Sequence, residues 1–252
     1  MQKVDEVAAV SPETPRQSQL IASGLHLVGF LLIGAGVAAM GFLAQRGAGG
    51  SGAGNTAGQL ASHSQSIRIY LTAILMDWAL LYYCWAGVHR HGGNLQTLSG
   101  GRWTRWQDIA ADVAIALPFW IVWEGAARGV HWLLGPSQAK TVDSLLPQSA
   151  LEILLWIATS ITAGICEEMA FRGYLQRQFY ALSGSVVMAV LGQGLVFGLF
   201  HAYQGWKNVV VISVLGALYG ALAAWRRNLR ANIIVHAWTD VWEGWLKFVV
   251  WR

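Results

Sequence analysis

Charged residues are scarce in this sequence: Asp, Glu, Lys and Arg together make up 12% of its 252 residues, whereas hydrophobic residues make up 55%. The net charge of +4 is spread thinly, without a lysine- and arginine-rich block or a nucleic-acid motif, so no nucleic-acid partner is predicted. The two cysteines, Cys84 and Cys166, lie far apart inside apolar runs and indicate neither a disulfide framework nor a thiolate metal site. This composition is typical of a membrane protein.

Apolar runs long enough for a helix to cross a bilayer, about 18 to 25 residues, recur along the chain. The predicted spans are 20–44, 67–88, 109–134, 149–169, 185–203, 208–225 and 230–250. The low-complexity segment 45–66 and the segment 89–108 are predicted to be loops, and the amphipathic stretch 170–184 could hide one more span. We therefore expect an all-α fold, a polytopic transmembrane helix bundle of about seven or eight spans.

Two adjacent carboxylates and an arginine interrupt one of these runs, in "ATSITAGICEEMAFRGYL". A charged side chain at the centre of a membrane helix costs about 2.5 to 3.5 kcal/mol on insertion scales. Residues four apart share a helix face, so Glu168 is predicted to pair with Arg172, while Glu167 points about 100° away. Glu168 is then neutralised locally, and Glu167 remains available for another role.

Two further polar stripes have helical spacing. Phe197 and His201 are four residues apart in "FGLFH", and Asn232, His236 and Asp240 fall on successive turns in "NIIVHAWTD". Polar stripes in apolar helices face a bundle interior or a wet cavity.

Helix geometry predicts the depth of these groups. Glu167 lies 17 residues before Gly184 and His201 lies 17 after it, so an antiparallel hairpin places them at one height. A straight helix over 208–225 would leave His236 about 10 Å from the depth of His201, unless that helix tilts or unwinds. Small residues would allow this helix to pack closely on its neighbours: Gly216, Ala217, Gly220 and Ala221.

Three motifs over about residues 150–245 together resemble the CPBP family of intramembrane proteases, which includes type II CAAX prenyl endopeptidases and bacterial abortive-infection (ABI) proteins. They are E-E-x-x-x-R at Glu167 to Arg172, F-x-x-x-H at Phe197 and His201, and H-x-x-x-N/D at His236 and Asp240. The resemblance divides the chain into a polar N-terminal tail (1–19), N-terminal transmembrane spans (20–148) and a CPBP-like catalytic transmembrane core (149–252).

The resemblance implies a glutamate-dependent endopeptidase that hydrolyses a peptide bond in a membrane-embedded or lipid-linked substrate. Glu167 would be the general base, and His201 would help to hold and activate the water. His236, with Asp240, would stabilise the oxyanion.

The remaining motif residues would support this chemistry. Glu168 and Arg172 would order the site. Many family members have Asn where this chain has Asp240, and an ionised Asp cannot donate a hydrogen bond, so Asp240 must be protonated or act by orienting the neighbouring imidazole. Asn232 could supply the missing amide, and Phe197 and Asn232 are the predicted substrate-binding residues.

No cofactor is predicted, with zinc as the alternative. Glu167, His201 and His236 could form a three-ligand zinc site, but a compact H-E-x-x-H motif is lacking, and the resemblance to glutamic prenyl proteases implies metal-free chemistry. The predicted partners are membrane lipid and a membrane-embedded or lipidated peptide or protein. The predicted location is the bacterial inner membrane, as an integral multi-pass protein.

Other interpretations stay open. The protein could be a catalytically inactive membrane scaffold or sensor that regulates a partner protein. A transporter would better fit an inverted repeat, which the sequence does not show. Asp112, and Glu124 with Arg128, are predicted to be boundary charges or packing pairs. Trp238 and Trp242 are predicted to be interfacial or lipid-facing, or to line a substrate groove.

Overall fold

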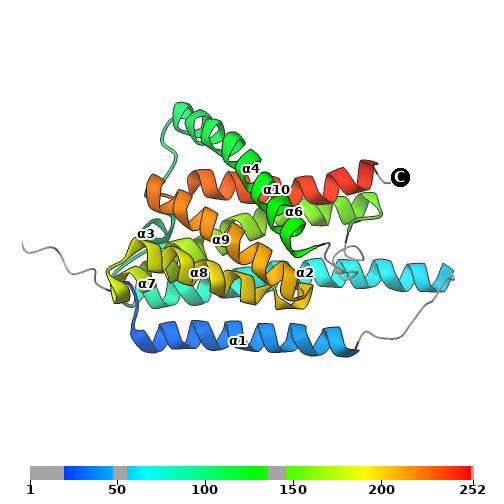
Figure 1. Cartoon of the computed structure of the whole chain (residues 1–252), viewed down its shortest axis with the longest axis horizontal. Coiled ribbons are helices and arrows are strands. Elements are labelled where there is room, and N and C mark those ends of the chain that lie inside the picture. Colours follow the sequence, from blue (N-terminus) through cyan, green and yellow to red (C-terminus); the bar gives the residue numbers. More distant parts are fainter. Residues whose placement is uncertain (1–19, 48–55, 136–145, 251–252) are drawn as a thin grey trace, which may run out of the picture.

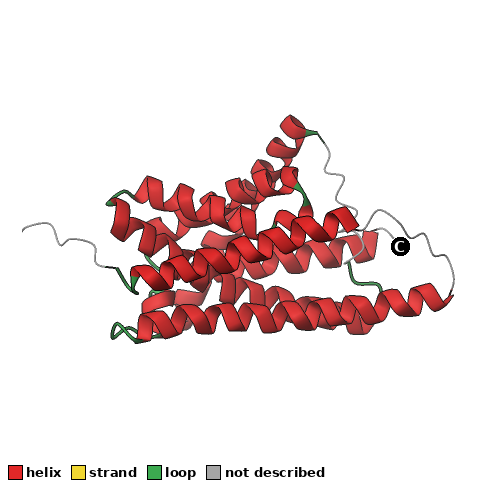
Figure 2. Ribbon diagram, turned by 90° about the horizontal axis from the view of Figure 1, so that it is seen from below, coloured by secondary structure: helices red, strands yellow, loops and turns green. Residues whose placement is uncertain are grey.

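All regular elements of the described residues are helices, which confirms the all-α prediction (Figure 2). The computed structural model describes residues 20–47, 56–135 and 146–250. The predicted polar tail 1–19 and the centre of the predicted glycine-rich loop, 48–55, lie outside the described residues.

The helices follow the predicted spans in order (Figure 1). Their bounds are α1 Gly24–Gly47, α2 Thr56–His89, α3 Leu95–Ser99, α4 Trp106–Leu134, α6 Ala150–Glu167, the π-helix η1 Glu168–Leu175, α7 Gln176–Ser183, α8 Val186–Phe200, the 3₁₀-helix η2 Ala202–Gln204, α9 Trp206–Arg226 and α10 Arg230–Val250. Among the described residues, four helical stretches are long and apolar enough to cross a membrane: Ser64–His89, Trp106–Leu134, Ala150–Ser183 and Trp206–Arg226. The chain is therefore an integral membrane protein.

Both predicted loops contain helix. Residues 56–66 belong to α2, so the predicted loop 45–66 is wrong in its second half, where glycine gives way to Gln, Leu, Ala and Ser. The segment 89–108 contains α3, which starts because the Asn94 side chain accepts a hydrogen bond from the Thr97 amide at 3.0 Å. It ends at Gly100, whose φ of 74° favours glycine.

The predicted end of the fourth span near residue 169 is also wrong, because one helical rod continues from Ala150 to Ser183. Every residue of its central π-helix, η1, is buried. The rest of the stretch 170–184 is amphipathic as predicted, because Gln176 and Gln178 are buried whereas Tyr180 and Leu182 are exposed, but it continues the same rod and adds no separate span. The rod ends where Gly184 adopts a φ of 65° and its N–H donates to the Tyr180 carbonyl at 2.8 Å. This turn confirms the predicted chain reversal and starts α8.

Close packing of α8 on α9 depends on small residues, as predicted. A Cβ at Gly194 would lie 2.8 Å from both the Ala217 nitrogen and the Ser213 carbonyl oxygen. Around this hairpin, α10 packs on α6 and α4, and α2 packs on α6. In Figure 1, α4 and α9 cross the other helices obliquely.

Helix α4 is fastened to the bundle by one buried carboxylate. Asp112 contacts Arg226 at the end of α9 and Arg230 at the start of α10, each at 3.0 Å, and accepts a hydrogen bond from the Trp103 indole at 3.0 Å. It is therefore a packing pair and not a boundary charge. The predicted pair of Glu124 and Arg128 also forms, at 3.0 Å on the surface of α4.

Candidate active site

A buried ion pair lies at the centre of the π-helix. Glu168 and Arg172 meet at 2.9 Å, and neither side chain is exposed, which confirms the predicted pairing. The Arg172 guanidinium also donates to the Gly216 carbonyl at 3.1 Å and lies 4.3 Å from the centre of the Phe197 ring. Hydrogen bonds and an aromatic face thus compensate for the desolvation of both charges.

Glu168 also holds α10 in place. Its carboxylate accepts hydrogen bonds from Asn232 Nδ2 at 3.1 Å and from His236 Nδ1 at 2.8 Å. The Asn232 amide donates in addition to the Tyr219 carbonyl at 2.8 Å, and Asn232 is fully buried. This placement does not fit the predicted substrate-binding role of Asn232, because both amide hydrogens already have partners in the protein.

The second imidazole nitrogen of His236 faces two further carboxylates. Because Nδ1 donates its proton to Glu168, Nε2 is the nitrogen that remains for chemistry. It lies 3.6 Å from Glu167 and 3.7 Å from Asp240. Neither of these two carboxylates makes a hydrogen bond to another described residue, and their side chains are 17% and 37% exposed. As the helix geometry predicts, Glu168 is neutralised and Glu167 is not.

His201 lies beside this group at the C-terminal end of α8. Its Nδ1 is 2.9 Å from the Phe197 carbonyl, so Nε2 is left free, and its ring centre lies 4.9 Å from that of Phe197. The Phe197 ring is in turn 6.1 Å from the His236 ring. Phe197 is only 4% exposed, so it separates and supports the two imidazoles and offers little surface to a substrate.

The predicted depths can be compared with these ring contacts. Phe171, one turn after Glu167, lies 4.9 Å from Phe197, one turn before His201, so the two halves of the hairpin meet at the expected height. Phe197 also lies 6.1 Å, ring centre to ring centre, from His236, so the two imidazoles lie on either side of one phenyl ring. In Figure 1, α9 runs obliquely, the tilt that a closer approach of the two imidazoles requires.

Sequence reasoning missed two residues near the site. Tyr203 in η2 interacts electrostatically with Glu167, Asp240 and Asp77. Its phenol oxygen accepts a hydrogen bond from Gln204 Nε2 at 2.9 Å, which leaves its own O–H as a donor. Asp77 on α2 interacts with Glu167, His236 and Asp240. Asp77 is the one acidic residue of the predicted span 67–88. A lone acid in an apolar span was the signal that could have identified it as a functional residue.

The residues proposed as zinc ligands do not form a metal site as they stand. Within residues 20–47, 56–135 and 146–250, no group of three or more His, Cys, Asp or Glu side chains is arranged to hold a metal ion. His201 also makes no ion pair or hydrogen bond to Glu167 or His236 in these ranges. We therefore derive no chemical step through a metal.

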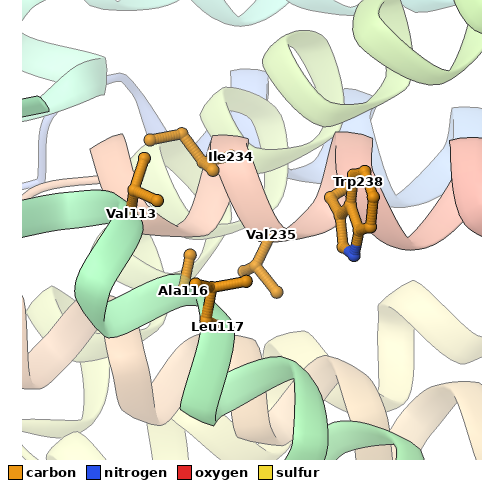
Figure 3. Close-up of a pocket in the computed structure, with 6 residues that line it drawn as sticks. All are labelled: Val113, Ala116, Leu117, Ile234, Val235 and Trp238. Atoms are coloured by element: carbon orange, nitrogen blue, oxygen red, sulfur yellow. The ribbon is translucent and has the colours of Figure 1, made fainter. Parts of the chain in front are cut away.

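An apolar pocket lies between α4 and α10, away from the polar face of α10 (Figure 3). Its volume is about 150 Å³, and it is lined by Val113, Ala116, Leu117, Ile234, Val235 and Trp238. Trp238 stacks on Trp242, and both rings contact Trp120 of α4. None of the predicted catalytic side chains lines this pocket.

Comparison with known proteins agrees with the three motifs. Residues 149–242 match the family model of type II CAAX prenyl endopeptidase Rce1-like proteins. No curated protein and no solved structure matches the chain. The matched segment contains all six predicted catalytic residues, from Glu167 to Asp240, and coincides with the segment that resembles the CPBP family. On these grounds, residues 149–242 are similar to the Rce1-like type II CAAX prenyl endopeptidases.

Proposed function

We propose that the protein is an intramembrane endopeptidase, which uses Glu167 to hydrolyse a peptide bond in a membrane-embedded or lipid-linked substrate. The observation that carries the proposal is the contrast between two neighbouring glutamates. Glu168 is fully buried and saturated with partners, whereas Glu167 makes no protein hydrogen bond within the described residues and faces His236 Nε2 at 3.6 Å. A free carboxylate beside a fixed imidazole is the arrangement that activation of a water requires.

In the proposed reaction, Glu167 accepts a proton from a water as its oxygen bonds to the scissile carbonyl carbon. His201, whose Nδ1 is held by the Phe197 carbonyl, is proposed to help hold this water through its Nε2. As the C–N bond breaks, Glu167 returns the proton to the leaving nitrogen. One residue thereby serves as base and then as acid.

Stabilisation of the oxyanion falls to α10. When doubly protonated, His236 donates from Nε2, and its orientation is fixed by the bond from Nδ1 to Glu168. Asp240 contributes as a donor only while it carries a proton, because an ionised carboxylate is an acceptor. Glu168, Arg172 and Asn232 act by holding His236 in place, and Phe197 acts by packing between the imidazoles.

One observation favours the alternative function, a catalytically inactive scaffold or sensor. This chain has Asp240 at the position where many family members have Asn. If Asp240 is ionised, one oxyanion donor is lost and a negative charge stands in its place. In that case the same domain would bind a partner protein in the membrane without cleaving it. For either function, we propose the bacterial inner membrane as the location.

The test is cleavage by the purified full-length chain in liposomes, with two probes: a farnesylated CAAX-box peptide and an unlipidated peptide with a single apolar span. We expect cleavage of at least one probe, and we expect Glu167→Gln to lower kcat at least about 100-fold, because a removed general base commonly costs 10²- to 10⁴-fold. The matched control is Glu124→Gln, which alters an acid of α4 outside the site and should leave the rate unchanged.

Two outcomes would contradict the proposal. Equal cleavage by wild type and by Glu167→Gln would remove Glu167 from the chemistry. Cleavage of neither probe, combined with a cellular function that survives Glu167→Gln and His201→Ala, would favour the scaffold. A metal chelator should leave the rate unchanged. Inhibition by the chelator that is reversed when zinc is added would instead support the metal-dependent alternative.

A further inference from the structure

Asp77 occupies a buried stripe of α2 that faces α6. The stripe follows the spacing of one helix face through Tyr70, Asp77, Leu81 and Cys84, and its apolar members are at most 5% exposed. Helix α2 packs on α6, the helix that ends at Glu167. Asp77 is therefore the one acidic residue on a helix face that otherwise serves packing, and it is turned toward the helix that carries the proposed base.

The surroundings of Asp77 are those of the site. Tyr70, two turns before Asp77 on the same face, has its ring centre 5.8 Å from that of Trp156 on α6, and the Trp156 indole donates to the Asp240 carbonyl at 2.7 Å. Cys84, two turns after Asp77, lies in the same buried cluster as Cys166, the residue before Glu167. Asp77 thus lies between two contacts that lead to the site, yet no hydrogen bond joins it to another residue in the described parts of the chain. An acid placed in an apolar stripe without a protein partner is costly, so a partner from outside the chain is expected.

We propose that Asp77 is a further residue of the reaction centre, which accepts a hydrogen bond from the water that Glu167 activates. The inference rests on the proposed endopeptidase function. It adds a residue from the N-terminal helices, because Asp77 lies outside the segment 149–242 that matches the family.

The chemistry of water explains what a second carboxylate adds. A water has two O–H donors, and Glu167 accepts one of them. The His201 Nε2 is one acceptor for the second, but no protein contact of the described residues fixes it against Glu167, so the molecule can still rotate about its bond to Glu167. With Asp77 accepting the second O–H, a lone pair of the oxygen is directed toward the substrate carbonyl. The gain is one of orientation, so it should appear in kcat and not in substrate binding.

The experiment compares Asp77→Leu, Asp77→Asn and Asp77→Glu in full-length protein in liposomes, with the two peptide probes named above. We expect Asp77→Leu to lower kcat about 10- to 100-fold while KM changes less than about threefold. Asp77→Asn keeps an acceptor oxygen and should retain more of the rate than Asp77→Leu. Asp77→Glu keeps the carboxylate at a shifted position and should lie between Asp77→Leu and wild type.

Thermal unfolding in the same liposomes separates this role from a packing role. Leu restores an apolar stripe, so Asp77→Leu should be at least as stable as wild type while its rate falls. Glu124→Gln is the matched control for loss of an acid and should change neither quantity. A kcat of Asp77→Leu within threefold of wild type would overturn the inference but leave the proposed function standing. Absence of wild-type cleavage of both probes, combined with a cellular function that survives Glu167→Gln and His201→Ala, would overturn the proposed function and, with it, the inference.

Discussion

The buried pair of Glu168 and Arg172 explains why the adjacent glutamates Glu167 and Glu168 have different roles. Glu168 has three partners on two helices, whereas Glu167, one residue earlier, has only the distant edge of an imidazole. Buried ion pairs contribute little net stability, but removal of one partner leaves an uncompensated charge. The pair is therefore best understood as the fixed frame against which His236 is aligned.

Arg172→Met should destabilise the protein by about 3 to 5 kcal/mol, because Glu168 would remain buried without its cation. The double variant Glu168→Gln with Arg172→Met should be less destabilised than Arg172→Met alone. Thermal or denaturant unfolding in detergent measures both. The control is Arg128→Met, which breaks an ion pair whose Arg128 side chain is 80% exposed and should cost less than about 1 kcal/mol. Equal losses for Arg172→Met and Arg128→Met would contradict this account.

Asp240 permits a direct test of the oxyanion proposal. Asp240→Asn introduces a permanent N–H donor 3.7 Å from the position of His236 Nε2, so it should keep or raise kcat. Asp240→Leu has no donor and should lower kcat about 100-fold. Peptide cleavage in liposomes is the measurement. If both variants have the same rate, Asp240 contributes no donor.

The hairpin of α8 and α9 depends on direct contact between the backbones of the two helices. Gly194 allows α9 to approach until a Cβ would meet the Ala217 nitrogen at 2.8 Å. At this distance the Gly216 carbonyl accepts hydrogen bonds from both Gln193 and Arg172. Spacing between two helices thus determines where the guanidinium lies.

Gly194→Val should therefore lower both stability and activity, since α8 and α9 must separate and the Gly216 carbonyl moves away from Arg172. We expect a loss of about 1 to 3 kcal/mol, the usual cost of overpacking. Unfolding and cleavage assays would both report it. Gly36→Val on α1 is the control for the intrinsic effect of valine in a helix, because a Cβ at Gly36 meets no atom within 4 Å. A Gly194→Val protein as stable as Gly36→Val would show that the close approach is dispensable.

The sequence predicted most of the helices and the core of the site, and its failures have physical causes. Helical spacing was sufficient to pair Glu168 with Arg172 and to align Asn232 with His236, because these relations are local. Asp77 was missed because Glu167, His236 and Asp240 lie 90 or more residues away from it in the chain. The π-helix was missed, and a tilt of α9 was predicted only as one of two ways to close the depth gap, because both features follow from packing between helices, which periodicity does not encode.

Considered as one molecule, the bundle joins the segment 149–242, which is similar to Rce1-like endopeptidases, to the helices that precede it. α2 packs on α6 and carries Asp77 to the site, whereas α4 crosses α9 and α10 and is held by Asp112. Helices α2 and α4 therefore have different relations to the segment 149–242. One contributes a side chain to it, and the other is fastened across its outer face.

Asp112→Asn should loosen that attachment, because Arg226 and Arg230 would lose their shared anion. We expect a loss of about 3 kcal/mol, typical of a broken buried charge pair. Thermal unfolding in detergent would measure the loss, with Glu124→Gln on the same helix as the control. An unchanged unfolding temperature would show that the apolar contacts of α4 with α10 suffice to hold it.

The π-helix at 168–175 has a consequence for how one rod meets several neighbours. A π turn takes up about one residue more than an α turn, so the halves on either side are rotated relative to each other by roughly the angle of one residue, 100°. Before it, α6 packs on α2 and α10; after it, α7 packs on α8. The π-helix therefore turns the packing face of α7 away from that of α6. The ion pair of Glu168 and Arg172 lies at the position where this direction changes.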